Sequence, residues 1–413
     1  MALGYAGGNM SEQGVLRERA LVRSGPRVDR LRKLDQGSAG LVDRLLQVAR
    51  TGLPGMQRPD GTMCFTRRFS AARVIAEPEG CSLRYTAITV LGARHLDTAG
   101  QRALLGGRTV GEVCDVLVDR LSSTNSVGDA ALAVWATAAC GHQGLERALG
   151  RLDVLHSGPS TRYIVEQAWV VSALVAARSL VDVERQLGLA RARLLDAQAG
   201  ALFGHVTGPD LVSRFRRHVS CFADQVYPIQ ALARLHASVG DPGALAAASR
   251  CADRIVSLQG PAGQWWWHYD SRTGAVVEGY PVYSVHQHAM GPMALLDLAD
   301  AGGQVEWDAI RRGLGWMVSA PEAGESLILD GPGLTVRKVA RRDPRKLVRG
   351  ARAVAPGLRP GTRLAALDRL WPPTAVDREC RPYEFGWLLD CWLGGASGPS
   401  TAGSDPMTQG TDG

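Results

Sequence analysis

The apolar residues of this chain gather in long runs and seldom alternate with polar ones. Six segments share one plan, in which a polar or aromatic opening leads into a run of small and apolar residues. They are Ser82–Leu96, Ser126–Cys140, Arg162–Ala177, Cys221–Ala237, Val282–Ala299 and Pro382–Leu393. A helix that is apolar nearly all round after its first turns is a buried helix. The pattern therefore predicts six buried helices.

Amphipathic helices with charged faces are predicted between these segments, at Leu41–Arg50, Thr109–Leu121, Leu180–Gln198, Pro242–Leu258 and Trp307–Ser319. Buried and amphipathic helices in alternation are what an inner ring wrapped by an outer ring requires, because a single hairpin cannot bury its own apolar face. We predict an all-α fold, an (α/α)6 toroid of about six helical hairpins that forms one domain over residues 38–393. An open helical solenoid is the structural alternative.

Both ends of the chain lack this pattern. Residues 1–37 are rich in Gly, Arg and Ser without sustained periodicity, and we predict a flexible N-terminal arm. Residues 394–413 are of low complexity, and we predict a disordered tail.

The net charge of +7 is unevenly spread. Eight basic residues crowd into 337–352, where Asp343 is the only acid. A solvated loop between two hairpins is the expected structure for this run, and docking on an anionic partner is the alternative. Nucleic acid is not expected as a partner, since no aromatic residues interleave with the charges.

The eight cysteines form no CxxC pair, and several lie inside apolar helical runs. This usage favours a reduced, cytoplasmic protein. The N-terminus has no apolar signal core, and no 18-residue apolar stretch predicts a membrane span. Neither a metal nor a cofactor is predicted.

One motif after an amphipathic helix carries a first resemblance. Gln259, Gly263 and Trp265 form QxxxGxW, and the chain here resembles squalene and related terpenoid cyclases. The resemblance implies a helical toroid. Class II cyclases protonate substrate with a DxDD motif, whose best counterpart here, Ser126–Asp129, has Gly128 where the acid would stand, and no DDxxD motif is present.

A second resemblance covers Gly263–Leu296, a Gly–Trp loop with an acid followed by a helix that opens with Tyr-Ser. This stretch is similar to carbohydrate-active toroids, namely glucuronyl C5-epimerases, unsaturated-uronyl hydrolases and N-acylglucosamine epimerases. The resemblance implies a six-hairpin enzyme with a polar, hydroxylated substrate.

The candidate site follows from the toroid, because the opening turns of its inner helices face a common cavity. Glu166, Asp224, Tyr283 and His286 are the predicted catalytic residues. Two carboxylates can divide acid and base roles if their environments separate their pKa values. His286 could act as a base near neutral pH with Tyr283 as the acid. As alternatives, Asp224 could cap a helix and Tyr283 could be structural.

The predicted substrate-binding residues supply hydrogen bonds, aromatic faces and, at Arg84, a clamp for a carboxylate or phosphate. They are Arg84, Tyr85, Tyr163, Gln167, Gln225, Trp265, Trp267, His268, Asp270, Tyr280, Gln287, Tyr383 and Glu384.

Three functions are compatible with these observations. The first is a carbohydrate-active epimerase, lyase or hydrolase that acts on a glycan or nucleotide sugar in bacterial polysaccharide metabolism. The second is a terpenoid-cyclase-like or prenyl-handling enzyme without the acid motif. The third is a toroid that serves as a binding or scaffold module. The polar helix openings favour the first.

Overall fold

The computed structural model describes residues 25–69, 77–158, 161–208, 211–212, 216–341 and 370–395. It also describes residues 348, 351, 352, 354, 355, 359, 362, 364 and 366. The predicted tail lies outside the described residues from 396 onward, as do residues 1–24 of the predicted arm. Among the described residues, no helix combines the length and apolar character needed to cross a membrane.

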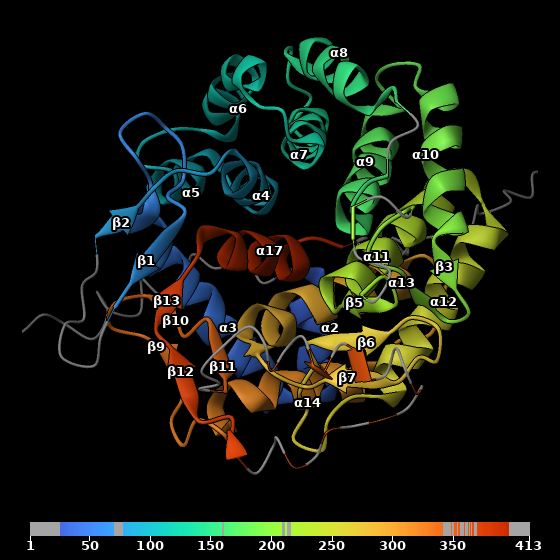
Figure 1. The fold of residues 1–413 in the computed structure, drawn as a ribbon. Helices are drawn as coiled ribbons and strands as arrows, with labels where there is room; N and C mark the ends of the chain where they lie inside the picture. The colour runs from blue at the N-terminus through green and yellow to red at the C-terminus, as the bar shows by residue number, and fades with distance from the viewer. Residues whose placement is uncertain are drawn as a thin grey trace, which may run out of the picture.

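Inner helices occupy all six segments predicted to be buried. They are α4 (Leu83–Ala93), α7 (Val127–Ala139), α9 (Ile164–Ala177), α11 (Ala223–Val239), α13 (Gly291–Asp300) and α17 (Pro382–Leu393). Each packs on the next, and α17 packs against α4 (Figure 1). The helices therefore form a closed ring within the described part of the chain, and the open solenoid is excluded.

An outer helix packs on each member of this ring or, for α13, on the turn 286–290 that precedes it. The outer helices are α3 (Gln36–Gly52), α6 (Val110–Arg120), α8 (Leu145–His156), α10 (Glu184–Asp196), α12 (Pro242–Ser257) and α14 (Trp307–Ser319). The described residues thus form the predicted (α/α)6 toroid. Helix α8 was not among the predicted helices, and a short helix α5 (Thr98–Leu104) follows α4.

Local signals start several of these helices. Ser82 and Ser126 accept hydrogen bonds from the backbone N–H of the third residue after each, and so cap α4 and α7. Thr109 and Glu112 form a capping box at the start of α6.

Residues 26–34, 36 and 37, which we assigned to a flexible arm, are helical, and Asp35 between them caps α3. Helix α2 (Pro26–Leu34) buries Val28 and Leu31 completely, and α3 begins at Gln36. The sequence-based prediction was wrong here because α2 spans two turns and carries five charged residues, which mask its short apolar stripe.

Short antiparallel sheets gather where the inner helices begin. One sheet joins β5 (Val219–Cys221), β6 (His268–Asp270) and β7 (Val276–Glu278), and another joins β12 (Ala375–Asp377), β11 (Lys338–Ala340) and β8 (Val282–Tyr283). A third joins β13 (Glu379–Cys380), β1 (Thr66–Arg68) and β2 (Pro78–Glu79). Two-stranded hairpins are formed by β3 (Gln198–Ala199) with β4 (Leu202–Phe203), and by β9 (Ile328–Leu329) with β10 (Leu334–Thr335).

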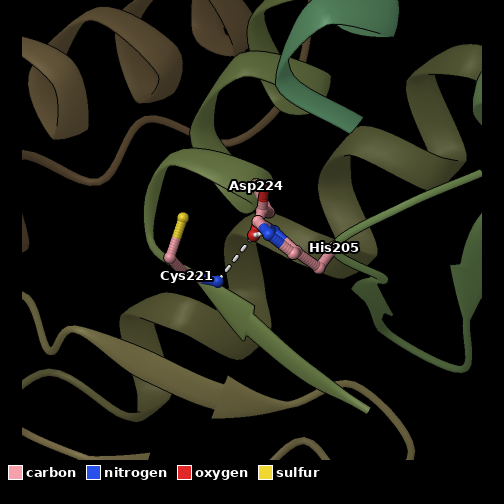
Figure 2. Close-up of side chains that lie close together, drawn as sticks. All are labelled: His205, Cys221 and Asp224. Carbon is pink, nitrogen blue, oxygen red and sulfur yellow. Dashed lines mark hydrogen bonds and ion pairs between the residues drawn. The ribbon is translucent and has the colours of Figure 1, made fainter. Parts of the chain in front are cut away.

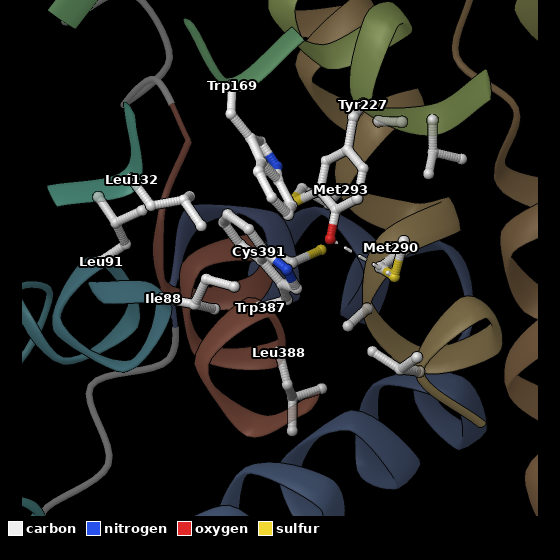
Figure 3. Close-up of a cluster of buried hydrophobic side chains, with 14 of the residues drawn as sticks. Ile88, Leu91, Leu132, Trp169, Tyr227, Met290, Met293, Trp387, Leu388 and Cys391 are labelled. Atoms are coloured by element: carbon white, nitrogen blue, oxygen red, sulfur yellow. Dashed lines mark hydrogen bonds between the residues drawn. The ribbon is translucent and has the colours of Figure 1, made fainter. Parts of the chain in front are cut away.

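The middle of the barrel is filled by apolar side chains from the inner helices (Figure 3). The ring of Trp387 lies 5.6 Å from that of Trp135 and 5.8 Å from that of Tyr227. Interiors packed in this way leave little free space. A ligand therefore has room only at an end of the barrel.

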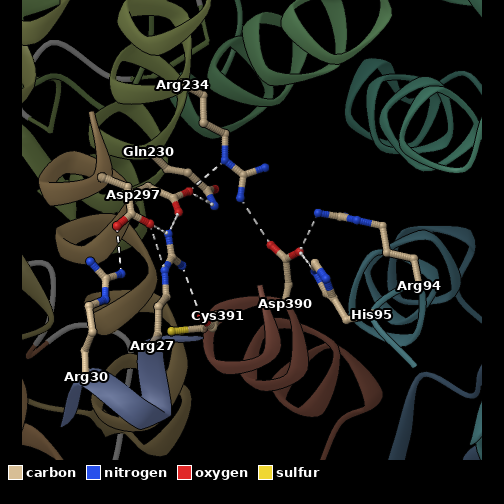
Figure 4. A network of polar contacts seen from close by, with 10 residues as sticks. Arg27, Arg30, Arg94, His95, Gln230, Arg234, Asp297, Asp390 and Cys391 are labelled. Atoms are coloured by element: carbon tan, nitrogen blue, oxygen red, sulfur yellow. Dashed lines mark hydrogen bonds and ion pairs between the residues drawn. The ribbon is translucent and has the colours of Figure 1, made fainter. Parts of the chain in front are cut away.

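The end where the inner helices finish carries a layer of ion pairs, whose residues line a cavity of about 250 Å³ (Figure 4). Arg234 binds Asp297 at 2.7 Å and Asp390 at 3.3 Å, and Arg94 binds Asp390 at 3.0 Å. Arg27 of α2 also pairs with Asp297. These contacts tie α2, α4, α11, α13 and α17 together and pair the charged groups that line this cavity with one another.

Candidate active site at the openings of the inner helices

A cavity of about 220 Å³ lies at the end of the barrel where the inner helices begin. Its lining comes from α4, α9, α11, α17, the loop before β6 and the strands β8 and β5. The lining residues are Arg84, Tyr85, Ile88, Val165, Trp169, Cys221, Ala223, Tyr227, Trp267, Tyr283, His286, Met290, Arg337 and Tyr383. Four inner helices, α4, α9, α11 and α17, therefore contribute residues near their openings to one cavity.

Aromatic rings, counting the imidazole of His286, belong to half of the lining residues. The ring of Trp267 lies 4.8 Å from that of Tyr283, and Tyr383 stacks on Tyr85 at 4.8 Å. Phe65 continues this stack outward, 5.6 Å from Tyr85. Such rings offer flat apolar faces with polar edges to a ligand.

An open groove of about 510 Å³ adjoins the cavity and shares Arg84 and Tyr85 with it. Its other lining residues are Phe65, Cys81, Ser82, Leu83, Arg120, Ser123, Thr124, Ser126 and Asp129. A ligand larger than the cavity can thus extend past Arg84 into this groove.

Arg84 organises the junction between cavity and groove. Its guanidinium lies 3.0 Å from Asp129 and 3.5 Å from Glu166, and it donates to Ser126 Oγ at 3.1 Å. Its guanidinium carbon also lies 4.9 Å from the centre of the Trp169 ring, a cation–π contact. Two carboxylates from neighbouring inner helices are therefore held beside one another.

The surroundings of Glu166 shift the pKa of its carboxyl group. Burial raises the pKa of Glu166, and the nearby charge of Asp129 acts in the same direction, while Arg84 opposes them. A glutamic acid with a raised pKa keeps its proton at pH values at which an ordinary glutamic acid has lost it. This suits a proton donor.

Within the described part of the chain, Arg84 and Arg337 are the only Arg, Lys, Asp or Glu side chains that line the cavity. Arg337 lies over the ring of Tyr283 at 5.3 Å and binds Glu379 at 2.7 Å. Arg381 also binds Glu379 and donates to the Tyr85 hydroxyl at 3.0 Å. The carboxylates that pair with these arginines stand outside the lining, which leaves the cavity favourable for an anion.

The described part of the basic run 337–352 is not the solvated loop that we predicted. Lys338 binds Asp377 at 2.9 Å, Arg341 binds Glu278 at 3.5 Å, and Arg352 is buried against Glu278. The acids that neutralise the run are distant in sequence, so the local composition could not reveal them. Arg342, Arg345, Lys346 and Arg349 lie outside the described residues.

His286 lies in the cavity wall, on the π-helical turn η3 (His286–Met290), which precedes α13. Burial, aided by His288 and Arg337, lowers the pKa of His286 to about 3. Its ring is 5.1 Å from that of Tyr283, and burial raises the pKa of Tyr283. The imidazole is therefore neutral near pH 7, and the role of His286 as a base stays a prediction.

Three predicted ligand-binding amides turn into the walls. Gln167 donates to the carbonyl of Ala190, Gln225 binds both backbone groups of Phe203, and Gln287 accepts from the backbone N–H of Trp265. These glutamines are fully buried and fasten the inner helices to the surrounding chain. They do not line the cavity, and neither does Trp265, which is buried against Phe222.

Asp224 is also absent from the lining. It is fully buried and binds His205 and the backbone N–H of Cys221. The expected pairing of Glu166 with Asp224 is therefore not formed around the cavity. Glu166 also lines neither the cavity nor the groove, and it contacts Arg84 next to Asp129, which lines the groove.

The remaining predicted residues surround the cavity without lining it. Asp270 binds Arg272 in the β6–β7 turn, and Tyr280 donates to Glu322 beside a separate cavity of about 80 Å³. His268 lies in β6 beside Trp267, and Tyr163 is exposed beside His205.

Glu384 is fully buried next to Tyr383, and Thr335 donates to its Oε2 at 3.3 Å. Burial raises the pKa of Glu384 to about 8. Its carboxyl group is therefore largely protonated at neutral pH.

Several lining residues were not among the predicted site residues. Trp169 and Val165 follow from helical spacing, since they lie one turn apart on the same face of α9. Arg337 was recognised only as part of a basic run. Its approach to the cavity depends on the pairing of β11 with β8, which aligns Lys338 with Tyr283.

Three solved structures are similar to this chain over most of its length. The unsaturated glucuronyl hydrolase of Bacillus sp. GL1, described as responsible for the degradation of glycosaminoglycan, is 13% identical, with 85% of this chain and 94% of that chain covered and a TM-score of 0.54. An unsaturated glucuronyl hydrolase specific for heparin is 12% identical, with 86% of this chain and 95% of that chain covered and a TM-score of 0.53. The unsaturated glucuronyl hydrolase from Streptococcus agalactiae is 9% identical, with 86% of this chain and 90% of that chain covered and a TM-score of 0.54.

At these identities the similarity establishes the fold, which is the α/α toroid found in carbohydrate-active enzymes. No family model matches the sequence. No curated protein matches it either.

Proposed function

We propose that this chain is a carbohydrate-active enzyme that hydrolyses an oligosaccharide ending in an acidic sugar. The observation that carries the proposal is the junction at Arg84, where a small arginine-lined cavity meets an open groove beside Glu166 and Asp129. A terminal uronate fits the cavity, and the rest of the glycan extends along the groove. The scissile bond then lies at the junction.

The cavity favours a uronate for two reasons. Arg84 and Arg337 provide positive charge for its carboxylate, and Trp267, Tyr283 and Tyr383 provide faces for the sugar ring. The similar solved structures named above are glucuronyl hydrolases, which supports the same substrate class.

The two carboxylates divide the chemistry. Glu166 gives its proton to the leaving glycosidic oxygen, and Asp129 takes a proton from the water whose oxygen bonds to the anomeric carbon. The carbon–oxygen bond of the glycoside breaks, and one water molecule is consumed. Arg84 orients both carboxylates, and the neutral His286 is a hydrogen-bonding group for substrate hydroxyls.

Glu166→Gln tests the acid. We expect kcat on uronate-terminated oligosaccharides to fall by about 10²- to 10⁴-fold, because the amide cannot donate the proton, while substrate binding by calorimetry persists. Glu146→Gln, on the exposed face of α8, is the matched control and should retain full activity.

The proposal fails if uronate oligosaccharides neither bind nor react. A thermal shift with a prenyl diphosphate alone would support a terpenoid-type enzyme, which the aromatic lining also permits. The QxxxGxW motif does not favour that alternative, because Gln259 binds the carbonyls of Gly263 and Ala309 and Trp265 is buried, so the motif fastens α12 to α14.

A further inference from the structure

Three side chains of metal-ligand type meet at the start of α11 (Figure 2). His205 comes from the loop after β4, Cys221 ends β5, and Asp224 lies in the first turn of the helix. Their ligand atoms all lie within 4.8 Å of one another. Among the described residues, no other group of three such residues meets this condition.

The carboxylate of Asp224 is poorly satisfied for a group that is 0% exposed. Its Oδ2 accepts the backbone N–H of Cys221 at 2.7 Å and lies 2.8 Å from His205 Nδ1. Its Oδ1 has no hydrogen-bond partner among the described residues. A buried carboxylate oxygen without a partner is costly, and a cation is the group that removes this cost.

The backbone around the three residues is already fixed. The carbonyl of His205 accepts the N–H of Ile164 at 3.0 Å, and Cys221 pairs with His268 in the β5–β6 ladder. Asp224 is held by helix α11. Only short side-chain movements are then needed to bring the ligand atoms to coordination distance.

An ion can reach this position. The side chain of His205 is 34% exposed, with the ring of Tyr163 5.2 Å away, while Cys221 lines the substrate cavity. The three residues thus lie between the outer surface and the cavity.

We propose that His205, Cys221 and Asp224 bind one thiophilic divalent cation of the Zn²⁺ type in the wall of the cavity. A thiolate, an imidazole and a carboxylate together suit Zn²⁺ and the later transition metals, whereas Mg²⁺ and Ca²⁺ prefer oxygen ligands alone. Three protein ligands leave a fourth position for water or substrate. On binding, the thiol proton and any second imidazole proton pass to solvent, and the cation replaces them as the partner of Asp224.

The test uses the full chain, freed of metal with a chelator and titrated with Co²⁺ as a spectroscopic probe and then with Zn²⁺. We expect one Co²⁺ per chain, with a thiolate-to-cobalt charge-transfer band in the near ultraviolet that Zn²⁺ abolishes. Cys221→Ser should remove the band, and His205→Gln should weaken Co²⁺ binding at least about tenfold.

Cys251→Ser is the matched control, because Cys251 is a buried thiol near the same helix that contacts Gln225 at 3.5 Å. Cys251→Ser should keep the charge-transfer band and still bind one Co²⁺ per chain. Zn²⁺ should raise the Tm of the wild type and of Cys251→Ser and leave that of Cys221→Ser unchanged.

A charge-transfer band that persists in Cys221→Ser would overturn the proposal. So would a wild-type protein of normal Tm that binds less than one Co²⁺ per chain at saturation. Because the readouts are spectroscopic and thermal, the result is separate from the outcome of the Glu166→Gln experiment.

Discussion

Gly128 lies in the first turn of α7, where a larger side chain would meet the junction residues. A Cβ atom at this position would lie 2.9 Å from Arg84 Nη2 and 3.0 Å from Glu166 Oε1. Both atoms are at the ends of flexible side chains, so they can move without disturbing the backbone. The absence of a side chain at position 128 therefore allows Arg84 and Glu166 to meet.

Gly128→Ala should lower kcat on uronate-terminated oligosaccharides by about 100-fold, because it displaces the acid from its arginine. The unfolding free energy should not fall, since alanine favours the helix by about 0.5–1 kcal/mol. Gly150→Ala, with open space around its Cβ in α8, should leave the rate unchanged. A Gly128→Ala variant with wild-type kinetics would show that the junction is not the reaction centre.

Glu384 supplies a prediction about pH. The pKa of about 8 in the folded chain lies above the usual value for glutamate, so the stability linked to its proton is complete below about pH 4.3 and is lost as the pH rises through 8. In Glu384→Gln, the unfolding free energy measured in urea should fall less between pH 5 and pH 8 than in the wild type. Glu146→Gln should retain the wild-type pH profile.

At the scale of elements, the contact between α4 and α17 depends on two glycines. A Cβ at Gly386 would lie 2.6 Å from the carbonyl oxygen of Ile88, and one at Gly92 would lie 2.4 Å from that of Gly386. These contacts are with backbone, which cannot rotate away. The two helices can approach so closely only because neither residue has a side chain.

Gly386→Ala should therefore destabilise the protein by about 1–3 kcal/mol, the usual range for overpacking a tight contact. The midpoint of urea unfolding measures the effect. Gly150→Ala serves again as the control and should be neutral or stabilising. An unchanged midpoint in Gly386→Ala would mean that α4 and α17 are not in such close contact.

The sequence predicted the inner helices well because their apolar runs are long and continuous. It missed α8, although Leu145, Ala148, Leu149 and Leu152 follow helical spacing, because that stripe is short and its other positions are charged. The strands of two or three residues carry too few positions for alternation to be recognised. The turn η3 also escaped prediction.

The candidate site was predicted less well than the helices for a related reason. The sequence identified the polar residues at helix openings but not the direction in which their side chains point. Gln167, Gln225 and Gln287 have the same residue type and position as a ligand-binding amide, yet each binds neighbouring backbone. Which way such a side chain turns depends on chain segments distant in sequence.

At the scale of the whole molecule, the barrel has a partly aromatic cavity at one end, an apolar middle and an ion-paired layer with a second cavity at the other end. Burial alone would raise the pKa of Asp297, but Arg234 and Arg27 outweigh it and lower that pKa. The pKa of Asp390 is lowered in the same way, because Arg94, His95 and Arg234 outweigh the effect of burial. Both carboxylates stay ionised because several helices converge on them.

Asp390→Asn should cost about 3–5 kcal/mol at pH 7, since it leaves Arg94 and Arg234 without their shared buried partner. A carboxylate with a lowered pKa stabilises the fold above its unfolded pKa, and this contribution is lost as the pH falls through the folded value. The difference in unfolding free energy between variant and wild type should therefore shrink as the pH falls below about 4. Equal stabilities at pH 7 would contradict a structural role for this layer.

The contact of α17 with α4 also has a consequence for biosynthesis. These neighbours in space are about 300 residues apart in the chain, since α4 ends at Ala93 and α17 begins at Pro382. A ribosome must therefore synthesise the chain through Leu393 before α17 can dock on α4. Until then α4 exposes to the cell the surface that α17 will cover, and the nascent protein is open to capture by chaperones or to association with other nascent copies.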